Sequence, residues 1–201
     1  MKLIFATGNK GKLREASEIL GEGCTLITPA DMGITEDIPE TGDTLKENSE
    51  QKVDYLFSRL GCDCFADDTG LEVDALGGAP GVHTARYGGE GKDFNANMDK
   101  LLSELERVGA MEPSQRRARF HSVVTLVLGG QKYFFEGVLE GWIAFEKAGC
   151  GGFGYDPVFV ADEYPDRTLA EISEEAKNAI SHRGKALRAM AAFISGNDSA
   201  D

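Results

Sequence analysis

Three acidic residues occupy positions where the chain is expected to turn, and a carboxylate there can hold a metal ion or accept a proton from water. Glu40 precedes a long amphipathic segment, and Asp67 and Asp68 directly follow a short apolar run. Magnesium bound with a nucleotide takes one or two protein carboxylates, and water and phosphate oxygens fill its other positions. Adjacent side chains of an extended segment point in opposite directions, so we expect Asp67 and Asp68 to have different roles. The simpler alternative is a polar hairpin turn at residues 67–70.

The segment Thr7–Lys12, which reads Thr-Gly-Asn-Lys-Gly-Lys, combines side-chain donors, two glycines and two lysines at the start of a predicted helix. Helix N-termini and lysines both attract phosphate, so this segment is a candidate phosphate site. It is not a Walker P-loop, because only two residues separate Gly8 from Gly11 and Leu13 follows Lys12. An ordinary capped helix with surface lysines is the alternative.

Two further segments suggest recognition of a nucleobase. The glycine-rich segment Gly151–Pro157 carries Phe153, Tyr155 and Asp156. Its aromatic rings could stack on a base while the acid bonds the base edge, although aromatic packing in a core is the alternative. Lys177 and the Ser181–Arg183 segment place cations around a helix start, where the helix dipole disfavours positive charge. A role in binding is therefore as reasonable as a surface role.

Alternating helical and strand patterns must hold these residues in place. Strands are predicted at Lys2–Ala6, Cys24–Thr28 and Asp63–Ala66, and a long hairpin runs through Arg117–Leu128, Gly129-Gly130 and Gln131–Phe145. Helices are predicted at Lys10–Leu20, Thr44–Leu60, Phe94–Leu105, Glu174–Asn178 and Arg183–Ile194. The pattern predicts an α/β fold with a mixed, elongated central sheet, helices around it and two lobes that form a cleft. We expect one domain over residues 1–195 and a loose tail at 196–201.

The composition of the chain limits the kinds of partner that it is expected to bind. The chain has 201 residues, 41% of them apolar, and a formal net charge of −13. Such an acidic chain is not expected to bind a nucleic-acid polymer. The longest apolar run, Ala189–Ile194, is far shorter than the about twenty residues of a membrane span, and the N-terminus lacks the apolar stretch of a signal peptide. Four scattered cysteines without zinc spacing favour reduced thiols, so we expect a cytoplasmic protein. Because the chain has no long apolar run, we expect no membrane partner.

Read in chain order, the motifs closely resemble the inosine triphosphate pyrophosphatase family, which hydrolyses deaminated purine nucleoside triphosphates. The matching stretches cover nearly the whole chain: Thr7-Gly8-Asn9-Lys10-Gly11-Lys12, Glu40-Thr41-Gly42, Glu47-Asn48, Asp67 to Asp74, Gly78-Ala79-Pro80-Gly81, Ala85-Arg86-Tyr87, Gly151 to Pro157 and Ser181-His182-Arg183-Gly184. The departures of this sequence from the family pattern are mild. Thr69 stands where a serine is common, and His83-Thr84 stands where an aromatic and a serine are more usual, so we expect no catalytic role for His83.

The resemblance implies cleavage of ITP, dITP or XTP to a monophosphate and pyrophosphate by water, with Mg²⁺ held by Glu40 and Asp68. Asp68 would also accept the proton of the water, and Asp67 would orient its neighbour. The phosphates would be bound by Thr7, Gly8, Asn9, Lys10, Gly11, Lys12, Lys52 and Thr69. The base would be bound by Phe153, Gly154, Tyr155, Asp156, Lys177, His182 and Arg183. The resemblance also implies a homodimer.

Selection of the base has a physical rationale. Inosine and xanthosine carry an oxygen at C6, where adenosine carries an amino group. Donors such as Lys177, His182 and Arg183 satisfy an oxygen but leave adenine's donor unpaired, which can reject a substrate by about 10⁴-fold. Two alternatives remain open at this point: a nucleotide sensor without hydrolysis, and a pyrophosphatase for pyrimidine or other modified triphosphates.

Overall fold

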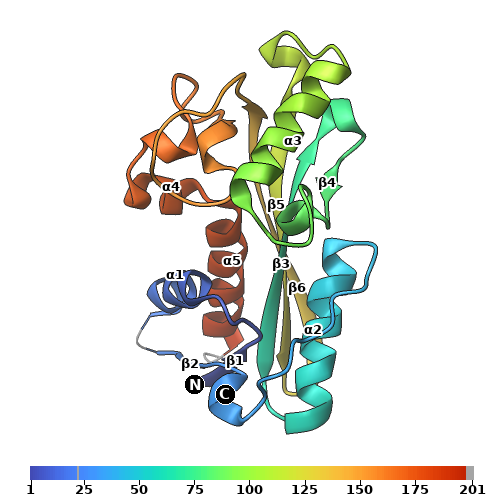
Figure 1. Ribbon diagram of the computed structural model, residues 1–201. Helices are drawn as coiled ribbons and strands as arrows, with labels where there is room; N and C mark the ends of the chain where they lie inside the picture. Colours follow the sequence, from blue (N-terminus) through green and yellow to red (C-terminus); the bar gives the residue numbers. More distant parts are fainter. Residues whose placement is uncertain (22, 198–201) are drawn as a thin grey trace. The chain divides into compact units, whose positions relative to one another are not determined.

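The computed structural model describes residues 1–21 and 23–197, which form two compact units (Figure 1). Unit 1 comprises Met1–Asp68, Ser122–Gly137 and the segment from His182 onward, and unit 2 comprises Thr69–His121 and Val138–Ser181. Within the described residues, seven strands form one sheet: six are hydrogen-bonded in the order β2-β1-β3-β5-β6-β7, and the seventh, β4, pairs with β3. The fold is mixed α/β, as the sequence predicted, and the expected cleft between lobes stays a prediction.

Three long strands contribute residues to both units. They are β3 (Cys64–Val73), β5 (Arg117–Leu128) and β6 (Gln131–Ile143). Unit 1 adds β1 (Lys2–Phe5), α1 (Lys10–Leu20), β2 (Thr25–Ile27), α2 (Leu45–Leu60) and α5 (His182–Asn197), with the short 3₁₀ turn η1 (Ala30–Met32). Unit 2 adds β4 (Pro80–Gly81), α3 (Phe94–Arg107), β7 (Phe159–Ala161) and α4 (Glu174–Ile180), with the turns η2 (Asp74–Leu76), η3 (Thr84–Arg86), η4 (Pro113–Gln115), η5 (Asp156–Val158) and η6 (Leu169–Glu171).

In unit 1 the central strand β1 is apolar on both faces, and each face packs under different helices. Leu3 and Phe5 belong to the cluster that contains residues of α1 and α5. Ile4 belongs to the cluster that contains Val53 and Leu56 of α2. Successive side chains of a strand alternate between faces, and β1 lies parallel to both β2 and β3, as buried strands of α/β proteins do. The continuous apolar run of β1 therefore forms a strand whose two faces are both covered by helices.

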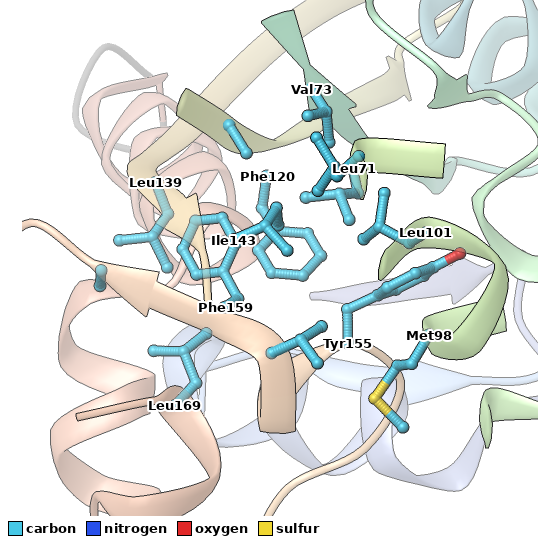
Figure 2. Packing of buried hydrophobic residues seen from close by; sticks show 14 of the residues in the cluster. Leu71, Val73, Met98, Leu101, Phe120, Leu139, Ile143, Tyr155, Phe159 and Leu169 are labelled. Carbon is cyan, nitrogen blue, oxygen red and sulfur yellow. The ribbon is translucent and has the colours of Figure 1, made fainter. Parts of the chain in front are cut away.

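The core of unit 2 lies beside α3 (Figure 2). Leu71 of β3, Ile143 of β6 and Phe159 of β7 pack with Met98 and Leu101 of α3, and all five are buried. Because Met98 and Leu101 are three residues apart on the helix, they share the face that meets these strands. This core anchors the glycine-rich segment that carries Phe153.

The main local difference from the sequence prediction concerns residues 67–70. They do not form a turn, because β3 continues from Cys64 to Val73 through both aspartates. Polar side chains are costly inside a strand that helices cover, but here cations from those helices pair with them. Composition alone favours a turn here, because it carries no information about partners that are distant in the chain.

Other element predictions agree closely with the structure. Helix α1 spans Lys10–Leu20 as predicted, and Thr44 is the N-cap of α2. Helix α5 continues to Asn197, past the predicted start of a loose tail, and residues 198–201 lie outside the described part. The single domain over 1–195 stays a prediction. Within the described residues, none of the helices combines the length and the apolar character that crossing a membrane requires.

Candidate active site

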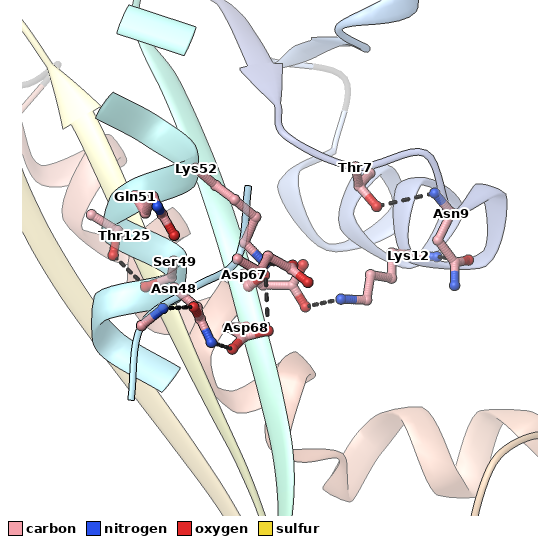
Figure 3. Close-up of polar contacts among 12 residues, drawn as sticks. Thr7, Asn9, Lys12, Asn48, Ser49, Gln51, Lys52, Asp67, Asp68 and Thr125 are labelled. Carbon is pink, nitrogen blue, oxygen red and sulfur yellow. Dashed lines mark hydrogen bonds and ion pairs between the residues drawn. The ribbon is translucent and has the colours of Figure 1, made fainter. Parts of the chain in front are cut away.

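Strand β3 directs Asp67 and Asp68 toward different helices of unit 1 (Figure 3). Lys12 of α1 and Arg183 of α5 pair with the Asp67 carboxylate. Asn48 and Lys52 of α2 reach the Asp68 carboxylate. The alternation of a strand thus gives the two adjacent acids separate surroundings, as the sequence predicted.

Asp68 shares one ammonium group with Glu40. Lys52 Nζ lies 2.6 Å from Glu40 Oε1 and 3.4 Å from Asp68 Oδ1, and it also donates to the Asp67 carbonyl at 2.7 Å. Both carboxylates therefore face one point, although Glu40 and Asp68 are distant in the chain. Lys52 is buried, so these oxygens replace the water that would otherwise solvate its charge.

Asn48 connects this pair of acids to the loop before α2. Its Nδ2 donates to Asp68 Oδ2 at 3.2 Å, and its Oδ1 accepts from the Gly42 amide at 2.8 Å. Asn48 lies in a stretch that resembles the family, but the sequence by itself assigns it no role. A signal was present: Asn48 and Lys52 are four residues apart on a helix face that also carries Val53 and Leu56, and buried polar groups on such a face need partners.

Asp67 is the buried centre of an ion network. Its carboxylate is 1% exposed and lies 2.8 Å from Lys12 Nζ and 3.0 Å from Arg183 Nε. Arg183 Nη1 also donates to Glu15 Oε2 of α1 at 2.9 Å. Burial alone would raise the pKa of Asp67, but Lys12, Arg183 and Lys52 outweigh burial and hold that pKa below its usual range. Asp67 is therefore an anion that joins α1, β3 and α5.

Asp68 has the opposite electrostatic setting. Burial raises its pKa above the usual value and the negative charge of Glu40 adds to this effect, while Lys52 and Lys12 oppose it. Burial by itself would lower the pKa of Lys52, but Asp68, Asp67 and Glu40 together raise it. A carboxylate with a raised pKa is a better proton acceptor than its neighbour, which fits Asp68 rather than Asp67 for base catalysis.

The Thr7–Lys12 segment folds as a capped helix start. Asn9 Oδ1 accepts from the amides of Gly11 and Lys12 at 2.8 and 3.2 Å, and Thr7 Oγ1 accepts from the Asn9 amide at 3.1 Å. Gly8 and Lys10 are exposed, and Lys12 pairs with Asp67. Asn9 thus satisfies two amides of the first turn, and the lysine side chains supply the positive charge of this segment.

In unit 2 the candidate nucleobase residues form a small polar cluster. Asp156 Oδ2 accepts from the Phe153 amide at 2.7 Å and pairs with Lys177 of α4. The Lys177 ammonium also lies 4.3 Å from the centre of the Phe153 ring, whose side chain is 54% exposed. At Gly152, where φ is +70°, a Cβ would lie 2.1 Å from Asp156 Oδ2, so glycine is required for this approach. An exposed ring can stack on a base, and the cation held beside it can donate a hydrogen bond to that base.

The structure does not group all of the predicted site residues. Unit 1 holds Thr7–Lys12, Glu40, Lys52, Asp68, His182 and Arg183, and unit 2 holds Thr69, Phe153, Gly154, Tyr155, Asp156 and Lys177. Arg183 is buried against Asp67 and Glu15, and Tyr155 is buried in the core of unit 2. Neither contact was expected from the sequence, because both partners are distant in the chain.

The donor set suits a hard divalent cation. Glu40 and Asp68 present carboxylate oxygens to one point, and magnesium favours such oxygens with water and phosphate at its remaining positions. Among the described residues, no group of three or more His, Cys, Asp or Glu side chains is placed to hold a metal ion. A site with two carboxylates fits an ion that arrives with a phosphate ligand.

This α/β chain, with paired carboxylates and lysines on one strand and the helices beside it, fits the class of enzymes that act on phosphoanhydrides. The chain belongs to the Ham1 family, which residues 3–193 match. A dITP/XTP pyrophosphatase of Flavobacterium johnsoniae is 48% identical over 190 residues, which are 94% of this chain and 96% of that protein. A dITP/XTP pyrophosphatase of Bacillus subtilis is 43% identical, over 95% of this chain and 96% of its own.

Solved structures agree with this assignment. A HAM1 protein from Coxiella burnetii has a TM-score of 0.90 and 36% identity, covering 98% of this chain and 99% of its own. The Staphylococcus aureus Ham1 protein has a TM-score of 0.89, also at 36% identity, over 98% of this chain and 100% of its own. The family resemblance read from the motifs is confirmed.

Proposed function

We propose that this chain is a nucleoside-triphosphate pyrophosphatase that hydrolyses ITP, dITP and XTP to the monophosphate and pyrophosphate, with Mg²⁺. The observation that carries the proposal is the convergence of Glu40 and Asp68 on the Lys52 ammonium in a member of the Ham1 family. Relatives that are dITP/XTP pyrophosphatases support the substrate class. Removing these nucleotides from the pool is the expected role in the cell.

Several residues bind the triphosphate in this proposal. Lys12 and Lys52 supply positive charge. Amides, hydroxyls and a further ammonium come from Thr7, Gly8, Asn9, Lys10, Gly11 and Thr69. Both lysines pair with carboxylates of β3 in the structure, which holds their side chains in defined positions. Phosphoryl-transfer enzymes act mainly by positioning groups and neutralising charge, and such preformed cations suit that role.

Asp68 accepts the proton of the water that attacks the α-phosphorus. The Asn48 side chain supports this role, because its Nδ2 donates to Asp68 Oδ2 at 3.2 Å and holds the carboxylate in a fixed orientation. Magnesium bound by Glu40 and Asp68 would neutralise the charge of the pyrophosphate leaving group. Asp67 keeps Lys12 and Arg183 in place rather than contacting the substrate.

Phe153 stacks on the base, and Lys177 donates to the oxygen at C6. Asp156 fixes both, because its Oδ2 accepts from the Phe153 amide and pairs with Lys177. His182 and Arg183, at the start of α5, remain candidates for the same base. The buried ion pairs of Arg183 orient its guanidinium group.

Further parts of this proposal come from the composition of the chain and, for the homodimer, from the family resemblance. The enzyme is a cytoplasmic homodimer that binds neither nucleic-acid polymers nor membranes. The net charge of −13 supports the absence of a nucleic-acid partner. Sedimentation equilibrium of the purified protein tests the dimer, and a single monomeric species would contradict it.

A panel of triphosphates tests the function. ITP, dITP, XTP, ATP, GTP and pyrimidine triphosphates are each incubated with enzyme and Mg²⁺, and pyrophosphate and orthophosphate are measured separately. We expect pyrophosphate only, with kcat/KM for ITP and XTP well above that for ATP. Binding without product release would indicate a nucleotide sensor, and preference for a pyrimidine triphosphate would indicate the other alternative. Either result would overturn the proposal.

A further inference from the structure

Thr84, at the start of η3, holds three segments of unit 2 together. Its Oγ1 accepts from the Leu71 amide of β3 at 2.8 Å and donates to the Gly81 carbonyl at 2.5 Å. Its own carbonyl accepts from the Tyr155 hydroxyl at 2.9 Å. A single residue therefore connects β3, Gly81 of β4 and the segment that carries the exposed Phe153 ring.

Tyr155 provides the connection on the side of the glycine-rich segment. Its side chain is 3% exposed and packs in the same cluster as Met98 and Leu101. Burial raises the pKa of the Tyr155 hydroxyl, which therefore remains a protonated donor at neutral pH. Because this donor is directed at the Thr84 carbonyl, Tyr155 acts on its neighbours and not on the edge of a base.

The flanking glycines explain why such an anchor is needed. Phe153 lies between Gly152 and Gly154, which have φ values of +70° and +66°. Glycine backbone samples many conformations, and Phe153 itself is exposed. Tyr155 is the first residue after Gly154 whose side chain is fixed in the core, so its hydrogen bond restricts the segment close to the ring.

We propose that Tyr155 and Thr84 form a positioning pair that holds the Phe153 segment in register with β3 and thereby sets the selectivity for the nucleobase. This inference rests on the proposed function and deepens it. In this proposal the pair contacts neither base nor phosphate, and it acts through Phe153, two residues before Tyr155, and Asp156, the residue after it. Groups that recognise a ligand must be held to within about half an ångström, and a neutral hydrogen bond from a buried ring can supply that restraint.

Tyr155→Phe tests the pair by removing one oxygen and keeping the ring. We expect the ratio of kcat/KM for ITP to kcat/KM for ATP to fall about fivefold, the usual scale for one lost neutral hydrogen bond. KM for ITP should account for most of the change, and kcat should stay within about threefold of wild type, because the acid pair is unaltered. Tyr87→Phe is the matched control, since Tyr87 packs against the same cluster, and it should leave the ratio unchanged.

Thr84 gives a second, independent test. Thr84→Val removes Oγ1 at nearly constant volume and frees the Leu71 amide and the Gly81 carbonyl, so the ratio should fall as it does for Tyr155→Phe. Thr84→Ser keeps the oxygen and should retain the wild-type ratio. If Tyr155→Phe fails to fold, the comparison of valine with serine at position 84 decides the question.

The outcomes separate this inference from the proposed function. If wild-type enzyme releases no pyrophosphate from ITP, the function is wrong and the pair has no selectivity to set. If wild type is active and both Tyr155→Phe and Thr84→Val keep its ITP-to-ATP ratio, the positioning role is overturned. A loss of thermal stability with equal losses on both nucleotides would also overturn it, because a merely structural bond predicts that result.

Discussion

Asp68 is held by two side chains of α2, which allows its chemical role to be tested at the scale of one residue. Asn48 and Lys52 contact opposite oxygens of the carboxylate, Oδ2 and Oδ1. An asparagine at position 68 would keep the shape and the volume but could not accept a proton from water. A change in rate would therefore report on chemistry rather than on packing.

Asp68→Asn should lower kcat for ITP by about 10²–10⁴-fold, the usual contribution of a general base, and leave the far-ultraviolet circular dichroism unchanged. Initial rates of pyrophosphate release at saturating Mg²⁺ measure this effect. Asp74→Asn is the control, because Asp74 is an acid whose carboxylate pairs with Arg119 in unit 2, and it should keep wild-type turnover. Retention of a tenth of wild-type turnover by Asp68→Asn would remove Asp68 from the role of base.

At the scale of elements, α2 matters because it carries both Asn48 and Lys52. Its first turn has a complete capping box: Thr44 Oγ1 accepts from the Glu47 amide at 3.1 Å, and Glu47 Oε2 accepts from the Thr44 amide at 3.0 Å. Such reciprocal bonds satisfy amides that the helix itself leaves unpaired.

Thr44→Ala should lower the free energy of unfolding by about 1 kcal/mol, because the Glu47 amide loses its acceptor. Urea titration followed by circular dichroism measures the difference. Thr44→Ser retains the oxygen and should restore stability to near the wild-type value. Equal midpoints for alanine and wild type would show that the cap contributes nothing.

Strand β6 approaches α5 at a position where there is no room for a side chain. A Cβ at Gly137 would lie 2.0 Å from the His182 carbonyl and 2.7 Å from the Ala186 amide. The close packing of β6 and the first turn of α5, which carries His182 and Arg183, therefore depends on this glycine.

Gly137→Ala should destabilise the protein by about 1–3 kcal/mol, the usual cost of overpacking a core, because strand and helix must move apart. Thermal unfolding by differential scanning calorimetry tests this expectation. Gly196→Ala in α5 is the matched control, because a Cβ there meets nothing within 4 Å. A wild-type Tm for Gly137→Ala would contradict the predicted steric conflict.

At the scale of the molecule, the Asp67 network makes stability depend on pH in a defined direction. The pKa of the Asp67 carboxyl is lower in the folded protein than in the unfolded chain, where it is about 3.9. The stability that this group contributes is therefore fully present above about pH 4 and is lost as pH falls through the folded value. Between pH 5 and 8 this group should contribute no pH dependence.

Asp67→Asn should lower the free energy of unfolding at pH 7 by about 3–5 kcal/mol, because Lys12 and Arg183 lose a buried partner. The variant should also lose less stability than wild type when the pH is lowered from 5 to 3. Tm measured across this range for both proteins tests the sign. Parallel curves would show that Asp67 is not the group responsible.

The sequence alone determined the elements and the family, because both depend on local patterns. Helix α1 and the β5–β6 hairpin follow from apolar spacing and from the two-glycine turn, and the order of short motifs identified a Ham1 relative. The opposite orientations of Asp67 and Asp68 follow from strand geometry once that segment is extended.

Only the tertiary structure decided which residues meet. Lys52 joins Glu40 to Asp68, Arg183 pairs with Asp67 across 116 positions of the chain, and Tyr155 bonds Thr84 across 71. Such pairs leave no periodic signal in the sequence, because the packing of helices on a sheet brings them together. The same long-range pairing makes β3 continuous through its two acids, where local composition favoured a turn.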